Sequence, residues 1–118
     1  MYRIKVETQF SSAHNLRGYR GKCEALHGHN WKVEVEVEAE VLDKTGMVMD
    51  FTLLKKRLHK VTEKLDHYYL NRHAYFKKVN PTSEHIAKYI FDSLKSRVAG
   101  LKSVTVWENQ ASRATYEA

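Results

Sequence analysis

Three histidines of this chain are spaced so that they could share one metal ion. His27 and His29 precede a segment, 31–41, whose odd positions are apolar, and residues two apart on a β-strand point to the same face. His14 keeps the parity of the apolar even positions in 2–10. Three neutral imidazoles with a fourth position open are typical of a catalytic zinc site. The pattern therefore predicts a Zn2+ site, and its alternative is a set of hydrogen-bonded core or turn histidines.

The chain has one cysteine, Cys23, four residues before His27. A thiol beside a metal ion or a cationic imidazole ionises readily and can act as a nucleophile or base. The alternatives are an inert buried thiol or a fourth metal ligand. A lone cysteine cannot form an intrachain disulfide, which indicates a reducing compartment. The N-terminal residues lack a continuous apolar stretch, so we expect a cytoplasmic protein without a membrane anchor.

Two further positions carry carboxylates that could take part in chemistry. Asp66 precedes His67 and could orient its imidazole for proton transfer, although such a pair can also be a surface helix cap. Glu108 shares the parity of Val104 and Val106, which predicts a carboxylate on a buried face. A buried carboxylate needs a partner, and the adjacent N–H donors of an amino-pyrimidinone ring would supply one. A strand end that reaches solvent is the alternative for Glu108.

The strands and helices that would position these residues belong to one expected domain, 1–118. Half-buried strands are predicted where apolar and polar residues alternate, at 2–10, 30–41, 102–108 and 112–117. Residues 11–28 are predicted to be an irregular connection. Two helices are predicted between the second and third strands: one is capped by Asp50, and the other has Pro81 in its first turn and ends at Gly100.

The order β-β-α-α-β-β predicts an α+β fold with an antiparallel sheet and two helices on one of its faces. The unpaired edges of such a sheet favour self-assembly. The net charge is +6, and the densest basic run is Lys55–Arg57, with Lys60 nearby, inside the first helical pattern. We interpret this run as a solvated helix face, because no interleaved aromatic residues accompany it. Nucleic acid is therefore not an expected partner.

Six motifs, taken in order, resemble the 6-pyruvoyl-tetrahydropterin synthase family. They are Phe10–His14, Cys23–Asn30, Gly46–Phe51, Leu65–His67, Asn80–Glu84 and Val106–Glu108. The likeness covers nearly the whole chain. It implies the tunnelling fold (T-fold), in which trimers close a barrel of strands, two trimers stack as a homohexamer, and the active sites lie between subunits.

The resemblance also implies a role for each candidate residue in one pterin-binding active site. Zinc would be bound by His14, His27 and His29, catalysis would involve Cys23, Asp66 and His67, and the pterin would be held by Glu108 and lined by Thr82. The Asp-His pair could reach the site from a neighbouring subunit.

The short spacing Cys-x-x-x-His-Gly-His is similar to that of the bacterial and archaeal carboxy-pterin synthases, and Cys23 argues against a folate-linked subgroup that has glutamate there. The implied reaction converts 7,8-dihydroneopterin triphosphate into 6-carboxy-tetrahydropterin, with loss of triphosphate and acetaldehyde, in queuosine biosynthesis. Asn109 departs from the commoner threonine after the glutamate. The alternatives are the pyruvoyl product, a zinc hydrolase or hydratase, and a non-catalytic pterin-binding oligomer.

Overall fold

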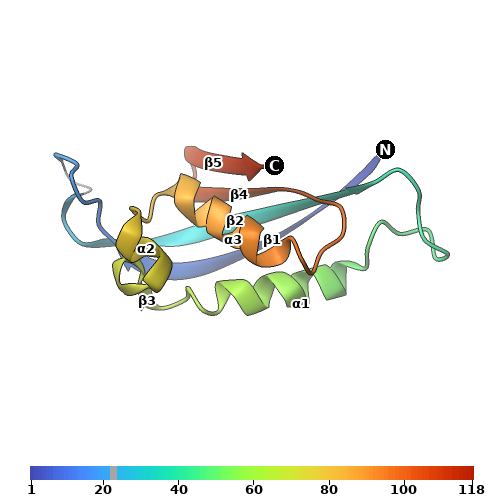
Figure 1. Ribbon diagram of the computed structural model, residues 1–118, viewed down its shortest axis with the longest axis horizontal. Coiled ribbons are helices and arrows are strands. Elements are labelled where there is room, and N and C mark those ends of the chain that lie inside the picture. The colour runs from blue at the N-terminus through green and yellow to red at the C-terminus, as the bar shows by residue number, and fades with distance from the viewer. Residues whose placement is uncertain (22–23) are drawn as a thin grey trace.

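A five-stranded sheet organises the computed structural model, which describes residues 1–21 and 24–118 (Figure 1). The strand order is β3-β1-β2-β4-β5. The strands are β1 (Tyr2–His14), β2 (His27–Ala39), β3 (Tyr68–Tyr69), β4 (Leu101–Asn109) and β5 (Ser112–Glu117). The four long strands pair antiparallel, as predicted, whereas the two-residue β3 runs parallel to β1. A strand as short as β3 has no alternation in the sequence from which it could be predicted.

The strands β1 and β2 extend further than predicted, at the C-terminal end of β1 and the N-terminal end of β2. Their register is continuous from Tyr2 opposite Ala39 to His14 opposite His27. The prediction that 11–28 is irregular was therefore wrong at both of its ends. Ser12 and His14 continue the buried face because their polar atoms find partners there.

The first helix, α1 (Phe51–Thr62), begins at the predicted cap, where the Asp50 side chain accepts a hydrogen bond from the Thr52 N–H. The second predicted helix, α3 (Ser83–Leu94), begins at Thr82, whose hydroxyl accepts from the His85 N–H. Pro81 therefore precedes the cap, and its predicted place in the first helical turn was wrong.

The predicted end of α3 at Gly100 was also wrong, because the helix ends at Leu94. Gly100 instead has a φ of 79° and lies against the backbone of Glu38, where an added Cβ would collide with the Glu38 carbonyl oxygen. Its own carbonyl accepts a hydrogen bond from the Glu38 N–H. Gly100 thus makes the turn into β4 and holds it against the end of β2. That strand ends at Ala39, so Val41, predicted on its apolar face, is exposed.

Between β3 and α3 the chain forms two short helical elements in place of the predicted loop. They are a 3-10 helix, η2 (Leu70–Arg72), and the helix α2 (Ala74–Lys78). The imidazole of His73 caps α2 by accepting a hydrogen bond from the Tyr75 N–H. These elements hold the end of the sheet that carries the histidines.

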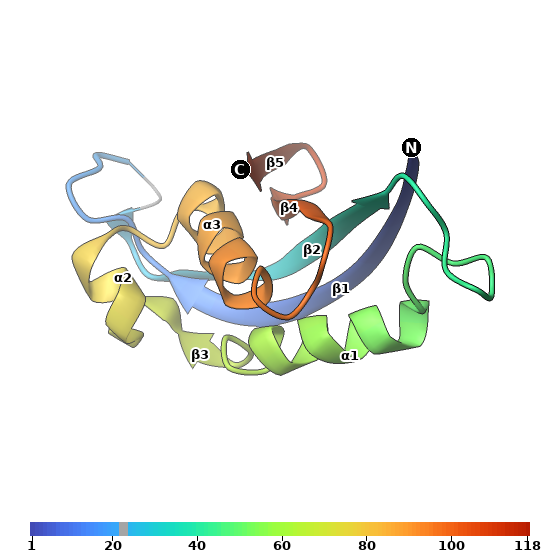
Figure 2. The same cartoon turned by 45° about the vertical axis from the view of Figure 1, so that its right-hand side comes forward.

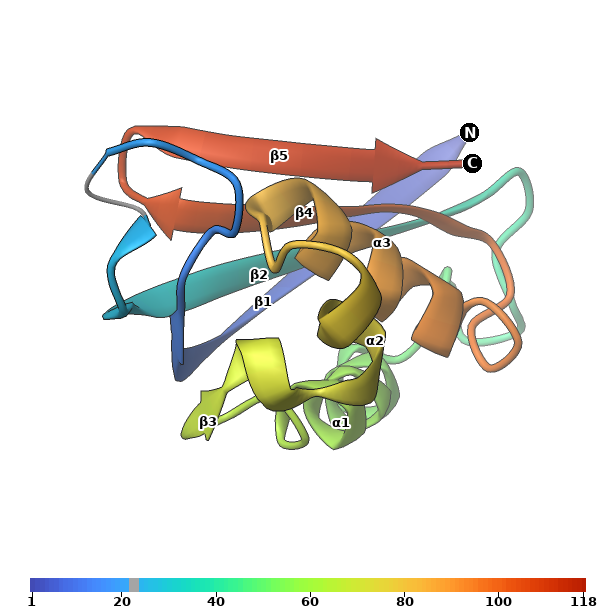
Figure 3. The same ribbon diagram turned by 60° about the vertical axis from the view of Figure 1, so that its left-hand side comes forward.

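The helices cover one face of the sheet, as predicted (Figures 2 and 3). Helix α1 packs on β1, while α3 packs on β4 and β5 and touches α1. The apolar side chains beneath them form one core, which includes Val6, Phe10, Trp31, Val33, Val35, Leu54, Ile90 and Val106. The opposite face is charged, and its ion pairs join β1 to β2, for example between Arg3 and Glu38. The sheet is open in the single chain, with β3 and β5 at its edges.

The longest helices, α1 and α3, have 12 residues each, whereas a membrane-spanning helix needs about 20 apolar residues. No helix in the described part of the chain qualifies as a membrane span.

The cap of α2 makes folding stability depend on pH. Burial lowers the pKa of His73 below its ordinary value of 6.5. Between the lowered value and 6.5 the unfolded chain binds more protons than the folded one, so stability falls as the pH falls through this window. We expect the difference in Tm between pH 7.5 and 5.5 to be about 2–4 °C larger for the wild type than for His73→Asn, which caps but does not titrate. Parallel pH profiles in thermal unfolding would contradict this role of His73.

Candidate active site

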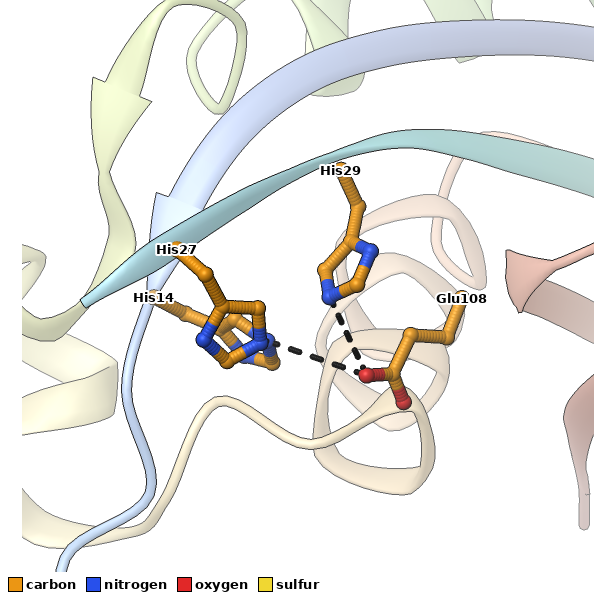
Figure 4. Close-up of side chains that lie close together, drawn as sticks. All are labelled: His14, His27, His29 and Glu108. Atoms are coloured by element: carbon orange, nitrogen blue, oxygen red, sulfur yellow. Dashed lines mark hydrogen bonds and ion pairs between the residues drawn. The ribbon is translucent and has the colours of Figure 1, made fainter. Parts of the chain in front are cut away.

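Four side chains converge at the end of the sheet where β1 finishes and β2 starts (Figure 4). His14 and His27 are opposite one another in the strand register, His29 follows on the same face of β2, and Glu108 comes from β4. One ligand atom from each of the four lies within 4.8 Å of the others. The convergence of the three histidines on the covered face, predicted from parity, is thus observed. The structure adds Glu108 to this group.

The hydrogen bonds of His14 and His27 determine which ring nitrogen carries the proton. His14 Nδ1 donates to the Pro81 carbonyl at 2.7 Å, and His27 Nδ1 donates to the Ala25 carbonyl at 2.7 Å. A carbonyl can only accept, so in each neutral ring the proton is on Nδ1 and Nε2 has a free lone pair. The two Nε2 atoms face each other at 3.0 Å. Two lone pairs at this distance repel unless a cation lies beside both of them.

The third imidazole also presents a nitrogen that needs a partner. Within the described residues, His29 Nε2 is buried without a well-aligned hydrogen bond. The nearest acidic oxygen is Glu108 Oε1, at 3.1 Å from His29 Nε2 and 4.0 Å from His14 Nε2. One cation placed among these atoms would satisfy all three rings and the carboxylate. Imidazole nitrogens with a carboxylate suit a transition metal, so the group can hold a metal ion.

The electrostatics of the group favour the protonation state that metal binding requires. Burial lowers the pKa of His14 and of His29 below the ordinary value of 6.5, although the carboxylate of Glu108 acts in the opposite direction. His14 is almost fully buried, with 1% of its side chain exposed. Desolvation disfavours the imidazolium, and only the neutral ring can bind a metal.

The four residues His14, His27, His29 and Glu108 are called the metal group below. Next to this group, a network of hydrogen bonds fixes the loop that carries the Pro81 carbonyl. The Asn80 side chain accepts from the Arg17 N–H at 3.0 Å and donates to the Arg17 carbonyl at 2.9 Å. The Arg17 guanidinium in turn donates to the carbonyls of Phe76 and Val79. These bonds join the loop after β1 to the residues before α3. They therefore hold the carbonyl that orients His14.

We expect Asn80→Ala to weaken metal binding about tenfold, the lower end of the usual effect of losing an outer-shell partner. The change removes both hydrogen bonds to the Arg17 backbone and frees the Pro81 carbonyl to move. Asn80→Asp keeps the acceptor for the Arg17 N–H and should recover part of the affinity. The measurement is competition for the metal against a chromophoric chelator. Wild-type affinity in Asn80→Ala would show that the network does not position His14.

The Asp66–His67 pair forms, but the single chain does not bring it to the metal group. Asp66 Oδ1 lies 3.0 Å from His67 Nδ1 and also accepts from the Ser11 N–H. The bond from Ser11, supported by the contact with His67, holds the pKa of the Asp66 carboxyl below its usual value. The His67 side chain is 84% exposed, and its φ is 52°. The pair thus faces outward beside β1, and its role in proton transfer stays a prediction.

Two predicted site residues remain, Thr82 and Cys23. The Thr82 hydroxyl is used to cap α3 next to Pro81, and its contact with a pterin remains a prediction. Cys23 lies outside the described residues. The positioning roles of Pro81, Ala25, Arg17 and Asn80 were not predicted, and the first two of these residues act through backbone carbonyls that no residue type signals.

The chain thus combines an open sheet, helices on one face of that sheet, and three histidines with a glutamate that could hold a metal ion. These features are typical of a metal-dependent α+β protein. The model of the family described as 6-pyruvoyl tetrahydropterin synthase matches residues 3–118. This chain belongs to the 6-pyruvoyl tetrahydropterin synthase family, and the resemblance predicted from its motifs is confirmed.

The chain is similar to relatives that are named for different activities. A 6-carboxy-5,6,7,8-tetrahydropterin synthase of Synechocystis is 43% identical over an alignment that covers 98% of this chain and 93% of that protein. A dihydroneopterin monophosphate aldolase of Pyrococcus furiosus is 38% identical over 90% of this chain and 89% of that protein. The solved structure of Caenorhabditis elegans 6-pyruvoyl tetrahydropterin synthase superimposes with a TM-score of 0.91 at 32% identity, covering 99% of this chain and 95% of that one. The predicted T-fold is confirmed.

Proposed function

We propose that this chain is a zinc-dependent 6-carboxy-5,6,7,8-tetrahydropterin synthase. Its substrate would be 7,8-dihydroneopterin triphosphate, and its product would enter queuosine biosynthesis after loss of triphosphate and acetaldehyde. The observation that carries the proposal is the pair of facing Nε2 atoms of His14 and His27, with His29 beside them, in a chain that is 43% identical to a synthase of this name.

His14, His27 and His29 would bind the zinc ion through Nε2. Zinc polarises oxygen atoms bound to it and so acidifies the adjacent C–H and O–H groups of a substrate side chain. Three imidazoles with an open position are the ligand set that catalytic zinc prefers. The carbonyls of Pro81 and Ala25 would keep the rings of His14 and His27 in the required tautomer.

Glu108 would bind the amino-amide edge of the pterin ring. Its carboxylate can accept two parallel N–H bonds, and it is 29% exposed beside the histidines. A ring held there would have its side chain next to the metal position, which is the proximity that the reaction needs. The same carboxylate lies 3.1 Å from His29 Nε2, so pterin binding would turn Glu108 from the imidazole to the ring edge.

Proton transfer would be shared by Cys23 and the Asp66–His67 pair. Cys23 as a thiolate would move a proton between the substrate side chain and the ring, and His67, oriented by Asp66, would exchange a second proton. The outward position of the pair supports its use by a neighbouring subunit, in a homohexamer built from two trimers. Thr82, which is adjacent to Pro81, would line the pterin pocket.

The test is mass analysis of the products that the purified, zinc-loaded protein forms from 7,8-dihydroneopterin triphosphate. A 6-carboxy-tetrahydropterin together with acetaldehyde is the expected result. The pyruvoyl product would assign the sister activity, and cleavage of dihydroneopterin monophosphate in a parallel assay would assign the aldolase activity named for the Pyrococcus relative.

Two controls separate catalysis from binding. The metal-free protein should give no product, because the acidification of the side chain requires zinc. Absence of turnover at full zinc occupancy, combined with tight pterin binding that survives chelation, would replace the enzyme by the pterin-binding oligomer.

A further inference from the structure

A groove with a strongly positive lining runs between α1 and the C-terminal end of α3, away from the metal group. It consists of two cavities of about 310 and 500 Å³. The two cavities adjoin one another, because Arg57, Lys60 and Arg97 line both of them. Their volumes are in the range of sites for small molecules.

The charge of the groove accounts for most of the excess charge of the chain. Its lining contains five cations, Lys56, Arg57, Lys60, Lys64 and Arg97, and one carboxylate, Glu63. Five positive charges against one negative leave an excess of four, while the whole chain has +6. Lys56 and Arg57 of the basic run, together with Lys60, therefore form one wall of a groove, while Lys55 lies outside it.

The groove gathers five cations without acidic partners; among the described residues other cations, such as Lys44, Lys55 and Arg72, also form no ion pair but do not line it. On α3 itself, Lys88 and Lys95 both pair with Asp92, and on the sheet Lys5 pairs with Glu34. Among residues 1–21 and 24–118, none of the five groove cations forms an ion pair. Like charges gathered without counter-charges repel one another, and a bound anion would relieve this repulsion.

The groove is also partly fixed before any anion arrives. The Arg57 guanidinium donates a hydrogen bond to the Arg97 carbonyl, which joins α1 to the turn after α3. Arg57 is half-buried, so its guanidinium is held at the junction of the two cavities. A cation that is already ordered loses less entropy when it binds an anion.

We infer that this groove binds an oligophosphate, a small anion with three or more negative charges. Lysine and arginine are the usual phosphate-binding side chains, and four excess charges match such a ligand. Proteins that bind single-stranded nucleic acid commonly combine cations with aromatic rings on which bases stack. The one aromatic residue of the lining, Tyr89, instead packs against His73, Tyr75 and Phe76. The site is separate from the pterin site and does not depend on the proposed reaction.

The experiment is calorimetric titration of the zinc-loaded protein with tripolyphosphate. Lys60→Glu is expected to lower the affinity of the groove at least about tenfold, because Lys60 lines both cavities and the charge is reversed. The matched control is Lys55→Glu, which changes the net charge equally on the same helix but lines neither cavity. It should bind as the wild type does. Equal loss in both variants, or no loss in Lys60→Glu, would overturn the proposal.

Triphosphate is also a product of the proposed reaction, so the titration must separate the two sites. We expect tripolyphosphate to bind the groove of His27→Ala, in which the metal site is disrupted, as it does in the wild type. Loss of binding in that variant would assign the anion to the active site. Tighter binding of a single-stranded RNA than of tripolyphosphate, with the same sensitivity to Lys60→Glu, would replace the oligophosphate by nucleic acid.

Discussion

Replacement of His27 by alanine is expected to weaken metal binding by more than 100-fold and to abolish turnover. Loss of an outer-shell partner typically costs 10–100-fold in affinity, and the loss of a ligand costs more. The change also removes one of the two lone pairs that face each other at 3.0 Å, so the reason for a cation at this point disappears. The measurement is metal content after dialysis, followed by competition against a chelator.

The control for His27→Ala is His59→Ala, which removes an exposed imidazole from α1, far along the chain from the metal group. It should keep both metal and activity. Because His27 is only partly buried and packs at the end of a strand pair, the Tm of metal-free His27→Ala should stay close to that of the metal-free wild type. Retention of tight metal binding by His27→Ala would show that His27 is not a ligand.

Cys23→Ala is expected to lower kcat by a factor of about 10²–10⁴, the usual contribution of a positioned acid or base, while the metal stays bound. The reason is that the thiolate would move a proton that neither the histidines nor Glu108 can carry while they hold metal and pterin. Steady-state kinetics with zinc-loaded protein measure the effect, and metal analysis of the same sample shows whether the site is filled.

The metal content separates the three readings of Cys23 that the sequence allowed. A slow enzyme with full metal supports the thiolate, and a fast one shows an inert thiol. A variant that loses metal as well as activity would make Cys23 a fourth ligand. Cys23→Ser, which keeps a hydrogen-bonding group of similar size but ionises far less readily, should resemble Cys23→Ala in rate.

Periodicity was enough to predict the metal group, because the strand geometry that buries Trp31 and Val33 also determines where His29 and His27 point. The same parity placed Glu108 on the covered face. It could not tell that Glu108 would lie 3.1 Å from His29, because that distance depends on how β4 is shifted along β2. The register between two strands that are far apart in the sequence is set by packing, so it cannot be predicted from either segment alone.

The features that escaped prediction depend on backbone atoms or on long-range contacts. The carbonyls of Pro81 and Ala25 orient two imidazoles, yet every residue has a carbonyl. The Asp66–His67 contact forms after α1 has ended at Thr62. Its outward direction could not be inferred, since it follows from the hydrogen bonds of this segment to Ser11.

His14 and His27 are paired directly in the strand register. Folding of this part of the chain therefore does not need the free energy of metal binding. Backbone hydrogen bonds of β1 and β2 and the core beneath Trp31 bring these two imidazoles together. In a zinc finger the metal must instead supply the free energy that folds the chain. Here the ligands are preorganised, so affinity reports on the site alone, and metal adds to stability only by linkage. The proposed zinc ion could therefore be released, exchanged and regained without unfolding of the chain.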